Sequence, residues 1–154
     1  MADCSATASI GTTIKVSVTA PATRDAVGYA ALTYTQVGAT LTIPQFGGST
    51  SPTSNVPLDT GEECKTPGPI NWNQLALTAL YVDDDAGHAI LLDGFSGANK
   101  GVNYSFEITY PNGAIRYTGG YVGSYQETPG SAGDNIMMDA TIELNYKPIL
   151  VAAP

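Results

Sequence analysis

The sequence predicts a mostly β protein of one domain, with one short helix and one long loop. Seventeen glycines and nine tyrosines are typical of an all-β chain that is rich in turns. Apolar and polar residues alternate in several short runs, which indicates strands with one buried face. A chain of 154 residues fits one domain and can bury a core without disulfide bonds. We therefore expect residues 1–154 to form a single domain.

The clearest alternation covers residues 104–121 and predicts a β-hairpin. Side chains alternate along a strand, so one face would carry Tyr104, Phe106, Ile108, Tyr110, Ile115, Tyr117 and Tyr121. Keeping these residues together pairs Ile108 with Tyr117, which requires a turn with an even number of residues. A four-residue turn is favoured over a two-residue turn, because Pro111 has no N–H to donate to the ladder.

The remaining strands are predicted from shorter runs. Residues 12–20 and 139–146 each alternate along a strand, and residues 73–82 contain another. Residues 30–43 hold two short β runs on either side of a glycine. The expected inward positions are Ile14, Val16, Val18, Leu32, Tyr34, Leu41, Ile43, Ala140, Ile142, Leu144 and Tyr146.

One short helix is predicted at about residues 84–93. Asp84 or Asp85 can cap its first turn, where the helix dipole also favours acids. Gly94 suits a C-terminal position that needs a left-handed backbone. His88 is expected to have a surface or capping role. The expected buried stripe consists of Ala86, Ala89 and Ile90.

Residues 44–70 lose the alternation and are rich in Gly, Ser, Thr and Pro. This length exceeds the ~12–15 residues that are usual for a connection. The loop is therefore either disordered or ordered by docking on a neighbouring subunit. Residues 1–9 are expected to form a flexible arm, and residues 149–154 a C-terminal tail.

The composition argues against specific nucleic-acid binding, metal binding and catalysis. The chain has six scattered basic residues and fourteen acidic residues, which gives a net charge of −8. A set of specific phosphate contacts is therefore not expected. A single histidine cannot form a metal site alone, and the acids at 83–85 lack EF-hand spacing. Cys4 and Cys64 are expected to be free thiols or to form a disulfide bond with each other at a late stage. They are not expected to form a zinc site. No nucleophile elbow or phosphate-binding glycine loop is present. No catalytic residue, cofactor or metal is therefore predicted.

Targeting signals are also not apparent in the sequence. Met1–Ser9 lacks the basic start and apolar run of a secretory signal, and no apolar stretch approaches ~18 residues. We expect a chain that is made in the cytoplasm and does not enter a membrane.

Four segments carry a resemblance to a known family. In order they read ATRDAVGYAALTYTQVGATLTIPQFGG, DDDAGHAILLDGF, YSFEITYPNGAIRYTGGYVGS and ATIELNYKP, with the Gly/Pro-rich loop after the first. The most specific pieces are Asp85-Ala86-Gly87 before the helix and the Pro-Asn-Gly turn. From Gly11 to Pro148 the chain resembles the major tail (tail tube) protein of long-tailed, non-contractile bacteriophages.

The resemblance implies a β-sandwich or barrel-like subunit with one short flanking helix and a long assembly loop. Six copies would close into a ring, and rings would stack into the virion tail tube, assembled in the host cytoplasm. Double-stranded DNA would pass through the lumen without specific binding. The tape measure, tail terminator and distal tail proteins would be further partners. Sparse charge along the candidate strands agrees with sheet edges that another subunit occupies.

Candidate residues follow from this resemblance. An acidic lumen gives DNA phosphates no cations to bind, and the acids expected there are Glu107, Asp139 and Glu143. The residues expected to lie between subunits are Phe46, Val56, Leu58, Glu62, Glu63 and Lys65. Two alternatives remain, a carbohydrate- or surface-binding β-sandwich module, which would use the tyrosines, and a hydrolase with dispersed carboxylates.

Overall fold

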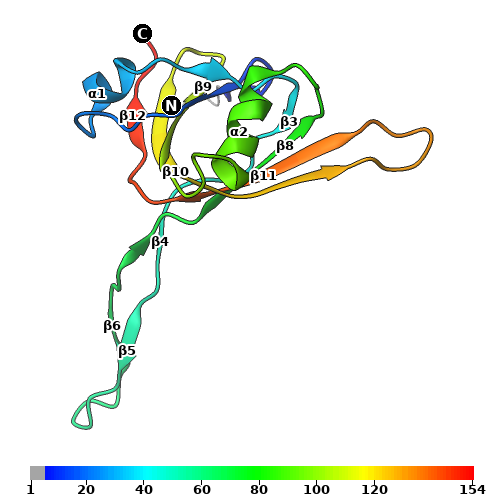
Figure 1. Cartoon of the computed structure of the whole chain (residues 1–154). Coiled ribbons are helices and arrows are strands. Elements are labelled where there is room, and N and C mark those ends of the chain that lie inside the picture. Colours follow the sequence, from blue (N-terminus) through cyan, green and yellow to red (C-terminus); the bar gives the residue numbers. More distant parts are fainter. Residues whose placement is uncertain (1–5) are drawn as a thin grey trace.

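The computed structural model describes residues 6–154, whose body is one curled antiparallel sheet that forms a half-barrel (Figure 1). The sheet order is β2-β1-β9-β10-β11-β8-β3, and β12 also pairs with β10. Its strands are β1 (Thr13–Ser17), β2 (Thr35–Gln36), β3 (Thr40–Thr42), β8 (Gln74–Leu80), β9 (Tyr104–Thr109), β10 (Ile115–Thr128), β11 (Met137–Leu144) and β12 (Ile149–Val151). Two helices flank it, α1 (Ala26–Ala30) and α2 (Ala86–Ser96). The prediction of a mostly β, single-domain chain is confirmed, although it gave one helix instead of two.

The core lies between the sheet and α2 (Figure 1). Strand β11 shows the expected alternation, with every second residue buried. The core cluster consists of Ile14, Val16, Val37, Leu75, Leu77, Ala79, Leu91, Tyr104, Phe106, Ile108, Val122, Met138, Ala140, Ile142 and Leu144. Tyr121, predicted on the buried face of the hairpin, is instead 37% exposed and lies opposite Glu143 on the other face of the sheet. Two further predicted inward residues, Val18 and Leu41, are 44% and 53% exposed. The reasons are that β1 ends before Val18 and that Leu41 lies on the short edge strand β3.

The predicted register of the central hairpin is wrong. Strands β9 and β10 are joined by a three-residue turn, in which the Tyr110 N–H donates to the Ala114 carbonyl and Gly113 has a φ of +90°. Ile108 therefore pairs with Arg116, not with Tyr117.

The physical reason is that β10 buries side chains on both faces. Tyr117 points away from the α2 side and stacks on Tyr29 of α1, with ring centroids 5.4 Å apart. Thr118 faces the core instead, opposite Phe106. The predicted register assumed that the apolar residues of β10 all face the core. This assumption is wrong, because apolar residues of β10 are buried on both faces.

The predicted helix exists as α2, but its end and its buried face differ from the prediction. Gly94 lies inside the helix and not at its end. The position requires a small residue, because a Cβ here would come within 2.6 Å of the Tyr104 ring. The buried residues are Gly87, His88, Leu91 and Gly94. Of the expected stripe, Ala86 and Ala89 are exposed and Ile90 is partly buried. Small residues bring this helix close to the sheet, so glycine marks its packed face and not its end.

The second helix, α1, is a single turn with no periodicity to reveal it. The Asp25 side chain caps it by accepting a hydrogen bond of 2.7 Å from the Gly28 N–H. This bond, together with one from the Thr23 hydroxyl, lowers the pKa of Asp25. The helix places Tyr29 over the outer face of the sheet.

Residues 44–70 form an extended hairpin that projects from the body (Figure 1). Two short ladders hold it, β4 (Ser49–Thr50) with β7 (Ile70–Asn71) and β5 (Thr53–Asn55) with β6 (Cys64–Thr66). We call residues 48–71 the long hairpin. A second projection is formed by the distal ends of β10 and β11 (Figure 1).

Both chain ends differ in part from the prediction. Residues 149–151 form β12 and pair with β10, so the predicted tail over 149–154 is partly a strand. Of the predicted arm over residues 1–9, residues 6–9 are exposed and residues 1–5 lie outside the described part. Cys4 is among the latter, so its predicted state falls outside the described residues, whereas Cys64 is exposed on β6.

No helix within residues 6–154 is long and apolar enough to cross a membrane.

Candidate assembly surfaces

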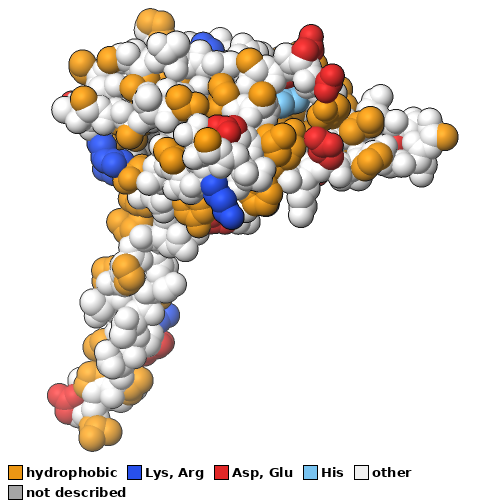
Figure 2. Space-filling model, in the orientation of Figure 1, with side chains coloured by type: hydrophobic (Ala, Val, Ile, Leu, Met, Phe, Trp, Pro, Cys, Tyr) orange, Lys and Arg blue, Asp and Glu red, His pale blue; other side chains and the backbone are white. Residues whose placement is uncertain are grey.

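The long hairpin is exposed on both faces along its strands. Every residue of β4, β5, β6 and β7 is exposed. At the tip of the hairpin, which comprises residues 56–63, Val56 is 58% exposed and Leu58 is fully exposed. Apolar and acidic side chains lie together there (Figure 2). The Glu63–Lys65 pair, at 3.8 Å, is solvent-exposed and contributes little. A two-stranded ribbon of this kind buries almost no apolar surface of its own.

The predicted subunit-contact residues divide between the tip and the root of this hairpin. Val56, Leu58, Glu62, Glu63 and Lys65 lie on its outer part and are all exposed. Phe46 lies at the root, where it is partly buried and packs against the core cluster.

The root of the long hairpin is fixed to the body. A Cβ at Gly48 would lie 2.7 Å from the ring of Trp72, so that ring packs directly on the backbone of the opposite strand. The Asn73 side chain donates to the Gly47 carbonyl at 3.4 Å, and Asn73 itself has a φ of +60°. The hairpin therefore leaves the body in a defined direction.

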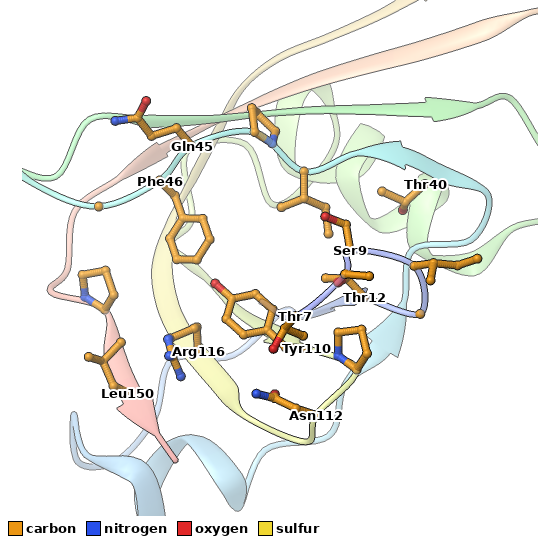
Figure 3. A pocket seen from close by; sticks show the side chains of 18 of the residues that line it. Thr7, Ser9, Thr12, Thr40, Gln45, Phe46, Tyr110, Asn112, Arg116 and Leu150 are labelled. Carbon is orange, nitrogen blue, oxygen red and sulfur yellow. The ribbon is translucent and has the colours of Figure 1, made fainter. Parts of the chain in front are cut away.

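A large open cavity, of about 1110 Å³, lies beside this root, and we call it the root pocket (Figure 3). Its apolar wall is formed by Ile43, Phe46, Trp72, Tyr110 and Leu150. Figure 3 shows the Phe46 and Tyr110 rings directed into it, with Leu150 and Arg116 at one side.

The charged groups of the root pocket are both cationic. Arg116 and Lys147 line it, and none of its described lining residues is an acid. The Arg116 guanidinium donates to the Val151 carbonyl at 3.3 Å and lies 5.1 Å from the centre of the Tyr110 ring. The pocket is thus a basic, apolar hollow in an acidic chain. The root pocket was not predicted from the sequence, because its walls come from segments far apart in the chain. The only hint in the sequence was the small number of Lys and Arg residues, two of which line the pocket.

The three predicted lumen acids share the sheet face opposite the core. Glu107 lies between buried positions of β9, and Asp139 and Glu143 lie between buried positions of β11. Glu107 pairs with Lys15 at 3.5 Å and is only 13% exposed, whereas Asp139 accepts a hydrogen bond of 2.9 Å from Thr78. Burial and the nearby Glu107 carboxylate raise the pKa of Tyr117. Asp139 and Glu143 are therefore the two acids of this set whose charge is not already paired with a cation among the described residues.

The predicted capping residues have different roles. Asp85 is the N-cap of α2, and its carboxylate accepts from the His88 N–H at 3.0 Å and from the Gly38 N–H at 3.1 Å. His88, expected to have a surface or capping role, is 2% exposed and donates through Nε2 to the Gly38 carbonyl at 3.0 Å. Asp84 is exposed and lies before the helix. Asp85 and His88 therefore join α2 to the turn between β2 and β3, which is a structural role.

Replacing Asp85 by alanine should lower the free energy of unfolding by about 1–2 kcal/mol, because two backbone N–H groups lose their acceptor. Asp84→Ala, which removes an exposed carboxylate one residue earlier, should change it by less than about 0.5 kcal/mol. Urea denaturation monitored by circular dichroism measures both variants. Equal losses would contradict the assignment of Asp85 as the cap.

The potential metal ligands of the described residues are dispersed. Within residues 6–154 no group of three or more His, Cys, Asp or Glu side chains is placed to hold a metal ion. The acids at 83–85 do not converge, since Asp83 accepts from the Tyr81 hydroxyl and Asp85 caps α2.

Comparison with known proteins finds similarity in structure alone. No protein-family model and no curated protein matches the chain. A chain of the six-fold symmetrised baseplate of the anti-feeding prophage matches with a TM-score of 0.69 and 6% identity, over 99% of both chains. The PVC sheath/tube terminator of an extracellular contractile injection system matches with a TM-score of 0.66 and 9% identity, over 97% of this chain and 100% of that chain. The SPP1 tail tube matches with a TM-score of 0.57 and 13% identity, over 89% of this chain and 75% of that chain.

These matches concern the fold, because identities this low carry no further information about a shared role. They include a contractile system, so the likeness does not single out non-contractile tails. None of the three assemblies is described as an enzyme. The chain therefore has the fold that recurs in subunits of these tail and injection-system assemblies.

Proposed function

We propose that this protein is a structural subunit of a phage tail or tail-like tube and not an enzyme. Copies close into rings, the rings stack, and the stack encloses a channel. The proposal is supported by a fold shared with subunits of a six-fold baseplate and of a tail tube. It agrees with the sequence resemblance to the tail tube proteins of long-tailed phages.

The observation that carries the proposal is the exposed long hairpin. An isolated two-stranded ribbon is marginally stable in water, and this one has no core contact beyond its root. Its exposed Val56 and Leu58 gain burial only by contact with another molecule. In a ring or a stack, that molecule is another copy of the chain.

The rings are proposed to be hexamers, and the proposed passenger of their channel is double-stranded DNA. Tape measure, terminator and distal tail proteins would contact the ends of the tube. The carbohydrate-binding alternative relied on the tyrosines, and three of the nine, Tyr29, Tyr104 and Tyr117, are buried and therefore not available to stack on a sugar.

Electron microscopy of the concentrated purified chain tests this function. Rings or uniform tubules with a central channel are expected. A chain that stays monomeric at millimolar concentration, and that is missing from the tail of the particle that encodes it, would rule the function out.

The outer-face acids are proposed to line the channel. Asp139→Lys combined with Glu143→Lys should make assembled tubules retain short DNA duplexes at low salt, with retention lost as salt rises. A matched control, Asp84→Lys with Glu127→Lys, makes the same charge change away from this face. DNA retention measured by co-sedimentation should increase only for the first pair, and equal retention by both pairs would remove the lumen assignment.

A further inference from the structure

We propose that the root pocket is the receptor for the tip of the long hairpin of a second copy of this chain. The inference rests on the proposed function and adds the receiving surface to it. The tip is defined here as residues 56–63.

The chemistry of the two surfaces is complementary. The root pocket combines an apolar wall with Arg116 and Lys147 and has no acid among its described lining residues. The tip combines exposed Val56 and Leu58 with three acids, Asp59, Glu62 and Glu63. Docking would bury apolar surface on both sides and bring acids to a rare pair of cations.

The size of the pocket suits a peptide segment. Small-molecule sites usually have volumes of about 300–1,000 Å³. The root pocket has about 1110 Å³ and is open to solvent. A turn of chain that carries two apolar side chains fills such a space better than a small ligand does.

The hairpin of the same chain does not reach this pocket. The root is held by Trp72 against Gly48 and by the bond from Asn73 to Gly47, and of these residues Gly47 and Trp72 line the pocket. From there the hairpin points away from the body (Figure 1). With a rise of about 3.3 Å per residue, its tip lies roughly 30 Å from the root. The occupant must therefore come from another copy.

This geometry makes the contact head-to-tail. The tip and the pocket are different surfaces of one chain, so each copy can give one contact and receive one. Such a contact repeats without limit, and it produces a ring where the rotation closes or a filament where it does not. Both outcomes are compatible with the proposed tube.

Photo-crosslinking of the full chain maps the contact directly. Leu58 is replaced by p-benzoylphenylalanine, the concentrated protein is irradiated, and the crosslinked dimers are analysed by mass spectrometry. Crosslinks between copies are expected at the pocket lining, which lies within residues 7–12, 40–47, 110–112 and 147–150 and includes Trp72 and Arg116. Crosslinks that map to another surface would overturn the docking.

A charge-reversed pocket tests the energetics. Lys147→Glu with Leu150→Glu should raise the concentration needed for assembly at least tenfold. Both residues are exposed, so the body should remain folded. The control Lys100→Glu with Leu92→Glu makes the same change at exposed positions near α2 and should assemble like the wild type. Adding Asp59→Lys and Glu62→Lys to the pocket variant should restore assembly.

The outcomes separate the two proposals. Wild-type tubules together with unimpaired assembly of the pocket variant would refute the docking and leave the tube function standing. A wild-type chain that gives neither tubules nor crosslinks would refute both.

Discussion

Removing most of the long hairpin will leave a folded protein that no longer assembles. In this variant, residues 51–69 are replaced by Asn-Gly, which joins the paired residues Thr50 and Ile70 through a two-residue turn. None of the removed residues belongs to the core cluster, and the Trp72 contact at the root is kept. The free energy of unfolding should therefore change by less than about 1 kcal/mol. Light scattering after gel filtration should give a monomer at concentrations where the wild type forms rings or tubules.

A shorter deletion separates the tip of the hairpin from its strands. Replacing residues 56–63 by Asn-Gly joins Asn55 to Cys64, which are paired, and therefore keeps both ladders. If the tip provides the contact, this variant should fail to assemble as completely as the longer deletion. Tubules of normal diameter from the longer deletion would show that the hairpin is dispensable and would remove the main support for the proposed function. Tubules from the shorter deletion alone would show that the tip does not provide the contact.

A large loss of stability from a small change is expected at Gly94. A Cβ at this position would lie 2.6 Å from a ring atom of Tyr104, a residue that is 1% exposed and belongs to the core cluster. Gly94→Val should lower the free energy of unfolding by about 2–3 kcal/mol through overpacking. Helix propensity alone predicts the opposite sign, a gain of a few tenths of a kcal/mol, because glycine is a poorer helix former than valine.

The matched control lies in the same helix. Ala89 is exposed, so Ala89→Val should cost only the difference in helix propensity, about 0.6 kcal/mol. In a Tyr104→Leu background the cost of Gly94→Val should fall by more than half, because the opposing ring is gone. Urea denaturation of the four proteins in this cycle gives the coupling. A cost that is unchanged in the Tyr104→Leu background would mean that the contact does not determine the need for glycine.

The sequence predicted well those elements that bury only one face. Strand β11 alternates cleanly between the core and the outer face, and Asp85 precedes a helix that begins at the next residue. In β10 the same alternation misled the register, because Tyr117 is buried on the outer face by Tyr29. A pattern with period two reports which residues are buried, but not which face the core occupies.

The assembly surfaces were less accessible to sequence reasoning. The long hairpin has no alternation because both its faces are exposed in the single chain, so its composition looked like that of a disordered loop. The root pocket depends on Tyr110, Lys147 and Leu150 approaching the chain near Phe46. Only the topology of the sheet places these residues together.

The position of Trp72 has a practical consequence. It is the single tryptophan of the chain, and it forms part of the root pocket wall while packing on Gly48. An occupant of the pocket would shield its indole from water, so the emission spectrum should shift to shorter wavelengths and quenching by iodide should weaken. The unlabelled protein therefore contains an optical reporter with which subunit association can be followed in real time.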